Sequence, residues 1–131
     1  MTIKKLIYLS LLLFSFHFIV TSQTIDSLKY KKCYDNIKKL FGQDVSCSGP
    51  FSIHEIENMY KVTIEKAGKK ESIPFGYEND KWKELKLKIK NGDKIFEFTT
   101  GTASWENLAG RAGIIIFRGN NTLGILITSL N

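Results

Sequence analysis

The C-terminal segment, Gly113 to Leu130, places the strongest constraint on what this chain can fold into. Two apolar stretches, Gly113 to Arg118 and Leu123 to Leu130, flank the turn residues Gly119-Asn120-Asn121, a pattern that predicts a β-hairpin. Within each stretch, apolar residues occupy odd and even positions alike. Because the side chains of a strand alternate between two faces, both strands need cover on both faces and belong at the centre of a sheet.

A second segment, Ile25 to Phe41, predicts an amphipathic helix. Its apolar residues recur at helical spacing, and its charged residues fall largely on the other faces. Thr24 is the expected cap and Gly42 the expected stop. We therefore predict an α+β fold with one N-terminal amphipathic helix packed on an antiparallel sheet of about four to six strands. One helix covers one face, so strand curvature, loops or a second molecule must close the other.

The segments between these two predict further strands. Tyr60 to Glu65 alternates apolar and polar residues, as a half-buried strand does. Glu71 to Phe75 is shorter, and its Pro74 confines it to a sheet edge. Phe51 to Asn58 fits either a strand or a short helix.

The turn pair Asn91-Gly92 is typical of a tight β-hairpin. Leu85, Leu87 and Ile89 alternate with lysines before it, and counting outward from the turn pairs Leu87 with Phe96. The same count pairs Leu85 with Phe98 and places Lys86 opposite Glu97, a favourable cross-strand ion pair.

The first 22 residues predict a signal peptide. Lys4 and Lys5 precede the apolar run Leu6 to Val20, and cleavage is expected before Gln23. As a helix the run measures roughly 22 Å, short of the ~30 Å hydrocarbon core. We therefore expect a secreted or periplasmic protein, not membrane-spanning in its mature form, with residues 23–131 folding as a single domain.

The two cysteines, Cys33 and Cys47, agree with the predicted export because exported chains fold in an oxidising compartment. Their spacing matches neither a Cys-x-x-Cys redox motif nor a zinc pattern. We predict a structural disulfide, which would close a loop of about 15 residues and stabilise the fold by about 3 kcal/mol.

Groups suited to catalysis are few. His17 lies in the predicted signal, which leaves His54 as the histidine of the mature chain, interpreted as a surface residue. It is accompanied by no nucleophile motif and no set of metal ligands, so neither a metal nor a cofactor is expected. Glu55 and Glu57 are interpreted as solvated charges. Other acids leave a carboxylate-pair hydrolase open.

The formal charge of +6 does not predict a nucleic-acid partner. Nearly all cations are lysines, and the arginines are Arg111 and Arg118, whereas phosphate and base-edge recognition relies on arginine.

The Gly-bounded segment from Thr99 to Gly113 holds the candidate site. Ser104 is the expected cap of a short helix that Gly110 ends. Four residues form the candidate binding surface: Trp105, Glu106, Asn107 and Arg111. The alternative is that Trp105 plugs one end of the sheet and Arg111 makes a local ion pair.

The block Ser104 to Gly113, read as Ser-Trp-Glu-Asn-Leu-Ala-Gly-Arg-Ala-Gly, and the apolar hairpin after it resemble small exported bacterial proteins of unassigned function. The resemblance covers the last quarter of the chain, and more faintly Cys47 to Pro50. It implies an exported protein but no activity and no site.

Two functions follow as expectations. The first is a non-enzymatic binding module, inhibitor-like or immunity-like, whose partner is a protein or another envelope component; a homodimer is left open. The alternative is a small carboxylate-based hydrolase acting on an extracellular polymer.

Overall fold

The computed structural model describes residues 30–42 and 44–130 of the 131-residue chain. The predicted signal peptide and cleavage site lie outside the described residues. Residues 30–41 are helical, so the helix expected over Ile25–Phe41 is tested from residue 30 onward only. The chain divides into two compact units, Met1–Lys32 and Cys33–Asn131, and all strands that the structure describes belong to the second.

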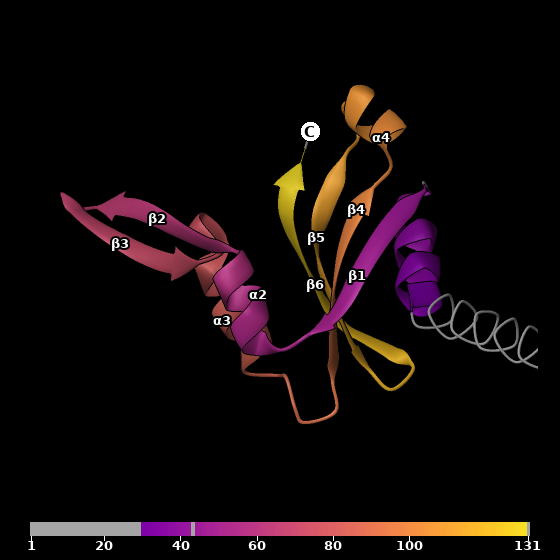
Figure 1. Cartoon of the computed structure of the whole chain (residues 1–131), viewed down its shortest axis with the longest axis horizontal. Coiled ribbons are helices and arrows are strands. Elements are labelled where there is room, and N and C mark those ends of the chain that lie inside the picture. Colours follow the sequence, from indigo (N-terminus) through magenta and orange to yellow (C-terminus); the bar gives the residue numbers. More distant parts are fainter. Residues whose placement is uncertain (1–29, 43, 131) are drawn as a thin grey trace, which may run out of the picture. The chain divides into compact units, whose positions relative to one another are not determined.

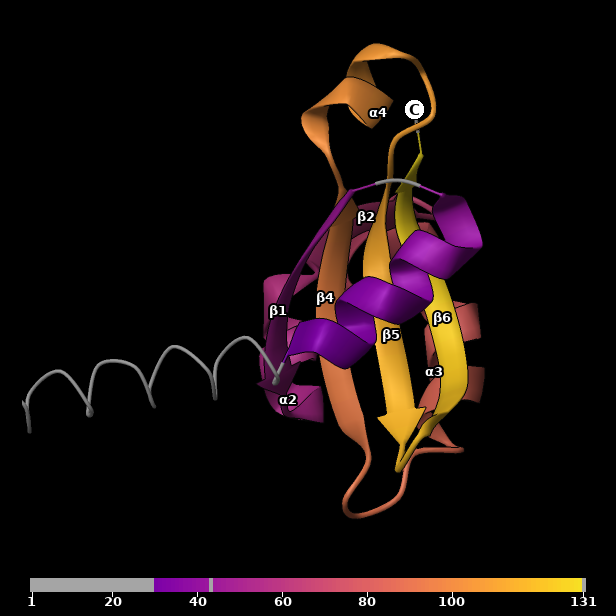
Figure 2. The ribbon, with the colours of Figure 1, turned by 90° about the vertical axis from the view of Figure 1, so that its right-hand side faces the viewer.

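Four antiparallel strands form the main sheet, in the order β1-β4-β5-β6 (Figures 1 and 2). They are β1 (Val45–Phe51), β4 (Lys94–Thr100), β5 (Arg111–Arg118) and β6 (Asn121–Leu130). A separate two-stranded sheet pairs β2 (Lys61–Lys66) with β3 (Lys69–Pro74). The α+β class and the antiparallel sheet are confirmed.

The C-terminal hairpin forms as predicted, with one difference between its strands. Ile114, Ile115, Ile116 and Phe117 of β5 are at most 1% exposed, which confirms that this strand is covered on both faces. Among the described strands, β6 pairs with β5 alone and forms an edge of the sheet. The expectation that both strands are central is therefore wrong for β6, whose apolar residues are mostly half-buried.

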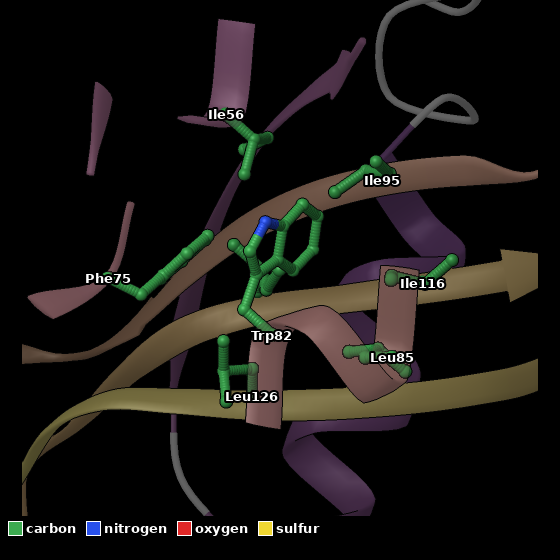
Figure 3. Packing of buried hydrophobic residues seen from close by; sticks show 8 residues of the cluster. Ile56, Phe75, Trp82, Leu85, Ile95, Ile116 and Leu126 are labelled. Atoms are coloured by element: carbon green, nitrogen blue, oxygen red, sulfur yellow. The ribbon is translucent and has the colours of Figure 1, made fainter. Parts of the chain in front are cut away.

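Two short helices cover one face of the sheet; the first was predicted only as an alternative to a strand, and the second was not predicted. They are α2 (Ile53–Met59) and α3 (Asn79–Lys86), the latter entered through the 3₁₀ turn η1 (Gly76–Glu78). Figure 2 shows both helices behind the four strands, and Figure 3 shows Trp82 packed among the core residues. The cluster comprises Ile56, Phe75, Trp82, Leu85, Ile95, Ile114, Ile116 and Leu126. The two helices thus cover the part of this face that carries the cluster.

The segment Phe51 to Asn58, which fitted either a strand or a helix, begins as β1 and continues as α2. Ser52 is the cap: its hydroxyl accepts the backbone N–H of Glu55, and the Glu55 carboxylate accepts the N–H of Ser52. This reciprocal pair satisfies two N–H groups that a helix start leaves free. The interpretation of Glu55 as a merely solvated charge is therefore incomplete.

The hairpin predicted around Asn91-Gly92 is wrong in its first strand. Leu85 lies in α3 and is buried, whereas Leu87 is 88% exposed just beyond the helix end. Trp82, Leu85 and Ile89 follow helical spacing and face the core. The β4 residues pair with β5 instead, Phe96 with Ile115 and Phe98 with Gly113.

The opposite face of the sheet carries the disulfide. Cys33, buried in the helix of residues 30–41, is bonded to Cys47 of β1, as predicted. Phe41 stacks on Phe98 of β4, and Phe96 meets Phe117 edge-on. Within residues 30–42 and 44–130, no helix has both the length and the apolar character needed to cross a membrane.

Candidate functional site

One corner of the helix-covered sheet face is polar, and neither α2 nor α3 contributes to the lining of the hollow there. Register places Ser46 opposite Thr99 and Ser48 opposite Glu97, all on the face that also carries Ile95. We call these four residues, Ser46, Ser48, Glu97 and Thr99, the polar corner. It lines a hollow of about 240 Å³, with Ala112 of β5 at its side.

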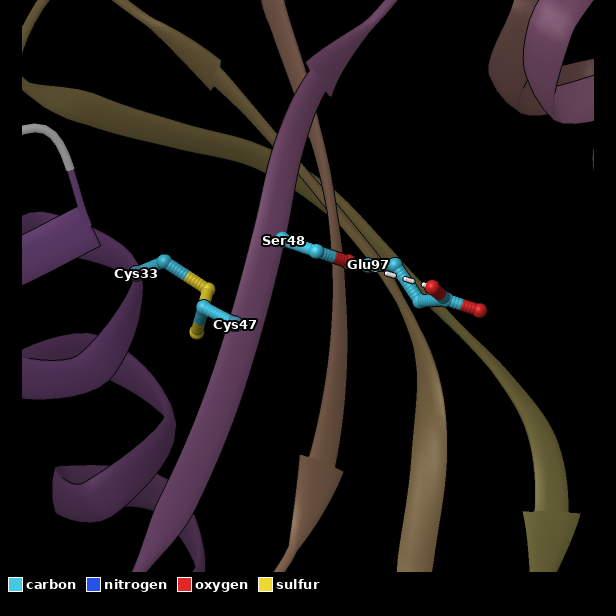
Figure 4. Close-up of a disulfide and its surroundings, with 4 residues drawn as sticks. All are labelled: Cys33, Cys47, Ser48 and Glu97. Carbon is cyan, nitrogen blue, oxygen red and sulfur yellow. Dashed lines mark hydrogen bonds between the residues drawn. A yellow bond between two sulfur atoms is a disulfide. The ribbon is translucent and has the colours of Figure 1, made fainter.

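Consecutive residues of β1 connect this corner to the disulfide. Figure 4 shows Cys47 directed to Cys33 on one side of β1 and Ser48 directed to Glu97 on the other. The Ser48 hydroxyl donates to Glu97 Oε2 over 3.1 Å. β1 is an edge strand, so bonds on both of its faces hold it against the fold.

Glu97 is the charged residue of the polar corner. Its carboxylate is half-buried and accepts two hydroxyls, Ser48 Oγ–H at Oε2 and Tyr60 O–H at Oε1, the latter over 2.6 Å. It forms no ion pair with any of the described residues. The negative charge is thus hydrogen-bonded but not neutralised.

Tyr60 borders the polar corner where α2 ends and β2 begins. Its ring stacks on Phe75 with centroids 4.7 Å apart, and Phe75 packs on Trp82. Burial, together with the hydrogen bond to the Glu97 anion, raises the pKa of the Tyr60 phenol well above its ordinary value of 10.0. The phenol therefore stays a donor to Glu97 throughout the physiological pH range.

The segment predicted to hold the site borders the corner on another side. It forms α4 (Thr102–Glu106), capped by Gly101 and not, as predicted, by Ser104. The helix ends before Gly110, and the chain turns at Leu108 with a positive φ of 55°. The Trp105 indole N–H donates to Thr99 Oγ1 at 3.2 Å and to the Thr100 carbonyl at 3.1 Å. The hydrogen bond to Thr99 connects α4 to the polar corner.

The four predicted site residues occupy different environments. Trp105 is half-buried against Gly110, whose missing Cβ leaves room for the indole. Glu106 and Asn107 are exposed, and the Asn107 amide donates to the Ala103 carbonyl. Arg111 starts β5 and donates to the Gly110 carbonyl. Trp105 and Arg111 meet through Thr100, which accepts the indole N–H and the Arg111 backbone N–H.

Other titratable groups serve the fold. Burial alone would raise the pKa of Glu57, but hydrogen bonds from Lys86 and Trp82 lower it on balance, so this carboxylate is not simply solvated. Arg118 donates twice to Asp93 and, with the Lys90 N–H, lowers the pKa of that carboxyl. Lys86, predicted to face Glu97, thus pairs with Glu57.

The described residues include no group of three or more side chains that could hold a metal ion. His54 lies exposed on α2, where its ring nitrogen meets the Asn58 amide over 3.0 Å.

A second hollow, of about 370 Å³, lies beside β2, β3 and the start of α3. Its lining includes three acids, Glu65, Glu71 and Asp80. All three are exposed, and Asp80 pairs with Lys83 over 3.6 Å. Exposed charges of this kind are screened by water and contribute little, and this hollow has no half-buried carboxylate such as Glu97 among its lining residues.

The residues missed by sequence reasoning are Ser48, Tyr60 and Glu97. One signal was present: Glu97 interrupts the apolar run Ile95-Phe96-Glu97-Phe98. A carboxylate within a strand that is apolar at both parities requires donors from elsewhere in the fold.

Comparison with known proteins gives no relative: no family model, no curated protein and no solved structure matches this chain.

Proposed function

We propose that this protein is an exported, non-enzymatic binding module that contacts a protein partner through the polar corner and the adjoining α4 segment. Trp105, Glu106, Asn107 and Arg111 belong to that segment and form its side of the contact surface. The polar corner forms the other side. The Trp105–Thr99 hydrogen bond makes the two sides one continuous surface.

The observation that carries the proposal is the state of Glu97. A stabilising ion pair would neutralise the carboxylate from within the chain, and full exposure would let water solvate it. Among the described residues Glu97 has no ion-pair partner, and it is not fully exposed: it is half-buried, accepts two hydroxyls, and lines a hollow. Partial burial of a carboxylate costs folding energy, and proteins keep such costly groups mainly at functional sites.

Export is part of the proposal. The Cys33–Cys47 disulfide is typical of an oxidising compartment, extracellular or periplasmic, and the first 22 residues have the pattern of a signal peptide. A protein or another component of the envelope is therefore the expected partner, and nucleic acid is not. A second copy of the chain is one protein that could occupy the surface.

The alternative, a carboxylate-based hydrolase, requires two carboxyl groups roughly 5–9.5 Å apart across a bound polymer. Among the described residues, Glu97 is the one carboxylate that lines the hollow at the polar corner. This arrangement favours binding over hydrolysis.

Site-specific photo-crosslinking tests the proposal. The full chain, expressed in its own cells, carries a photoreactive residue at Ser46 in the polar corner or, as a matched control, at Ser72 on β3; both serines are exposed. We expect one product of defined mass from position 46, lost when excess unlabelled protein is added, and none from position 72. No product at 46, or equal products from both positions, would overturn the proposal.

A further inference from the structure

We infer that the polar corner binds a cationic end group, a lysine ammonium or an arginine guanidinium, presented by the protein partner. This inference rests on the proposed function and specifies the chemistry of its central contact. It is carried by the geometry around Glu97.

The Glu97 carboxylate has acceptor capacity left. An ionised carboxylate offers about four lone-pair directions, and the described contacts use two, one on each oxygen, from Ser48 and Tyr60. Both donors precede Glu97 along the chain: Ser48 lies on β1, and Tyr60 lies at the end of α2. They fix the orientation of the carboxylate and leave each oxygen able to accept another N–H.

The hollow provides space for the incoming group. Its volume of about 240 Å³ is several times the ~30 Å³ that one water molecule occupies in the liquid. Its other lining side chains on this face are Ser46, Ser48, Thr99 and Ala112, which are small and uncharged. A cation entering it meets no positive side chain in that lining.

The energetics favour a cation over a neutral polar group. Two opposite unit charges attract several times more strongly at the effective dielectric of a protein surface than in bulk water. Charge-assisted hydrogen bonds are also roughly twice as strong as neutral ones. The +6 charge of the chain opposes this contact only weakly, because salt screens charges beyond about 8 Å.

A purely structural role for Glu97 makes a different prediction. If the carboxylate only fixes Tyr60, removing its charge changes stability and leaves ligand binding absent in every variant. If it is a cation site, Glu97→Gln keeps size and shape, retains one hydroxyl acceptor, and loses cation binding.

The test is a titration of the full chain, purified after export, followed by NMR amide shifts. The probes are N-acetyl-arginine amide and N-acetyl-lysine amide, with the uncharged N-acetyl-norleucine amide for comparison. We expect saturable shifts at Ser46, Ser48, Glu97 and Thr99 with the two cationic probes, and at least tenfold weaker binding of the better probe in Glu97→Gln. The ratio of the two cationic affinities tells guanidinium from ammonium recognition.

Glu84→Gln is the matched control because Glu84 is an exposed carboxylate on α3, away from the hollow. It should bind both cations as the unchanged protein does, and both variants should show the same thermal midpoint within a few degrees. Equal binding by Glu97→Gln, equal binding of the norleucine probe, or equal loss in Glu84→Gln would overturn the inference.

The two proposals fail separately. Absent probe binding together with specific crosslinking from Ser46 would overturn the cation site and leave the proposed function standing. Probe binding without any crosslinked partner would leave the cation site standing and overturn the proposed function.

Discussion

Two parts of one sheet face have opposite characters although they share their strands. On β4, Ile95 is buried beneath α2 and α3 as part of the core, whereas Glu97, two residues further on, lines an open hollow. On β1, Phe51 packs against the core, and Ser46 at the far end is exposed. The strands therefore do not determine burial on this face; the position of the covering helices does.

The border between the two parts is Tyr60. Its ring belongs to the covered part, stacked on Phe75, while its hydroxyl reaches into the polar corner and donates to Glu97. One side chain thus satisfies both environments, as the amphipathic shape of tyrosine allows. Because α2 ends at this residue, it does not extend over the polar corner.

Replacing Trp82 breaks the covered part and has the largest expected effect. Trp82 is 1% exposed and packs among the buried residues of the core cluster, including Phe75. Trp82→Ala should lower the free energy of unfolding by about 3–5 kcal/mol, because a large cavity remains. Urea denaturation measures this loss. Trp82→Phe, which keeps a ring but loses the N–H to Glu57, should lose less; equal losses would contradict a packing origin.

Removing the disulfide affects the strand that both parts share. The double variant Cys33→Ala, Cys47→Ala should lose about 2–5 kcal/mol, because the bridge restricts the unfolded chain and β1 is an edge strand. Chemical denaturation of the variant and of the unchanged protein, with and without reductant, gives the value. If reductant still lowered the stability of the double variant, the effect of reductant could not be assigned to the Cys33–Cys47 disulfide.

A methyl group at Gly110 tests the border formed by α4. A Cβ there would overlap the Trp105 ring, so Gly110→Ala should cost about 1–3 kcal/mol through overpacking. In a Trp105→Ala background the same change should be nearly neutral. The double-mutant cycle isolates the contact. Equal costs in both backgrounds would show that the clash with Trp105 is not the cause.

Charge removal in the polar corner has the smallest expected effect on stability. Glu97→Gln should change the free energy of unfolding by about 1 kcal/mol or less, because losing a hydrogen-bonded anion is offset by relief of its desolvation. The substitution should instead be seen clearly in the pKa of the Tyr60 phenol. Glu97 helps to raise that phenol's pKa, so the variant should bring the pKa down towards 10.0 without reaching it, since burial remains.

Absorbance titration of the phenolate measures this shift. A folded-state pKa above the unfolded value means that the folded protein holds its proton longer, so Tyr60 contributes stability below pH 10 that is lost as pH rises. Glu97→Gln should weaken that alkaline loss. Tyr60→Phe should remove the high-pKa transition altogether; its persistence would assign the transition to another group.

The sequence predicted correctly those features that follow from a local pattern of residues. The double-parity apolar run of β5 and the Cys33–Cys47 pair were both predicted from the sequence, since each pattern has one simple structural solution. The segment 85–90 misled because alternation with lysines fits a strand, while Trp82, Leu85 and Ile89 fit a helix equally well. In the structure Trp82, Leu85 and Ile89 all pack in or against the core cluster, as the helical spacing requires.

The polar corner depends on partners that are distant along the chain. Glu97 receives hydroxyls from residues 37 and 49 positions away, so no local spacing rule finds them. Trp105 was selected by residue type, and its contact with Thr99 ties it to the corner within six residues. The sequence did not predict where α2 ends, and the end of α2 determines which part of the sheet it leaves uncovered.

The contact between Gly110 and the Trp105 indole constrains how this sequence can drift over evolutionary time. Because a side chain at 110 overlaps a large ring at 105, the less costly order of change loses the ring before the glycine. Sequences descended from this one should therefore show Trp-Gly or small-small pairs at these sites, and rarely a tryptophan with alanine. That pairing offers a criterion for finding distant relatives where overall similarity has faded.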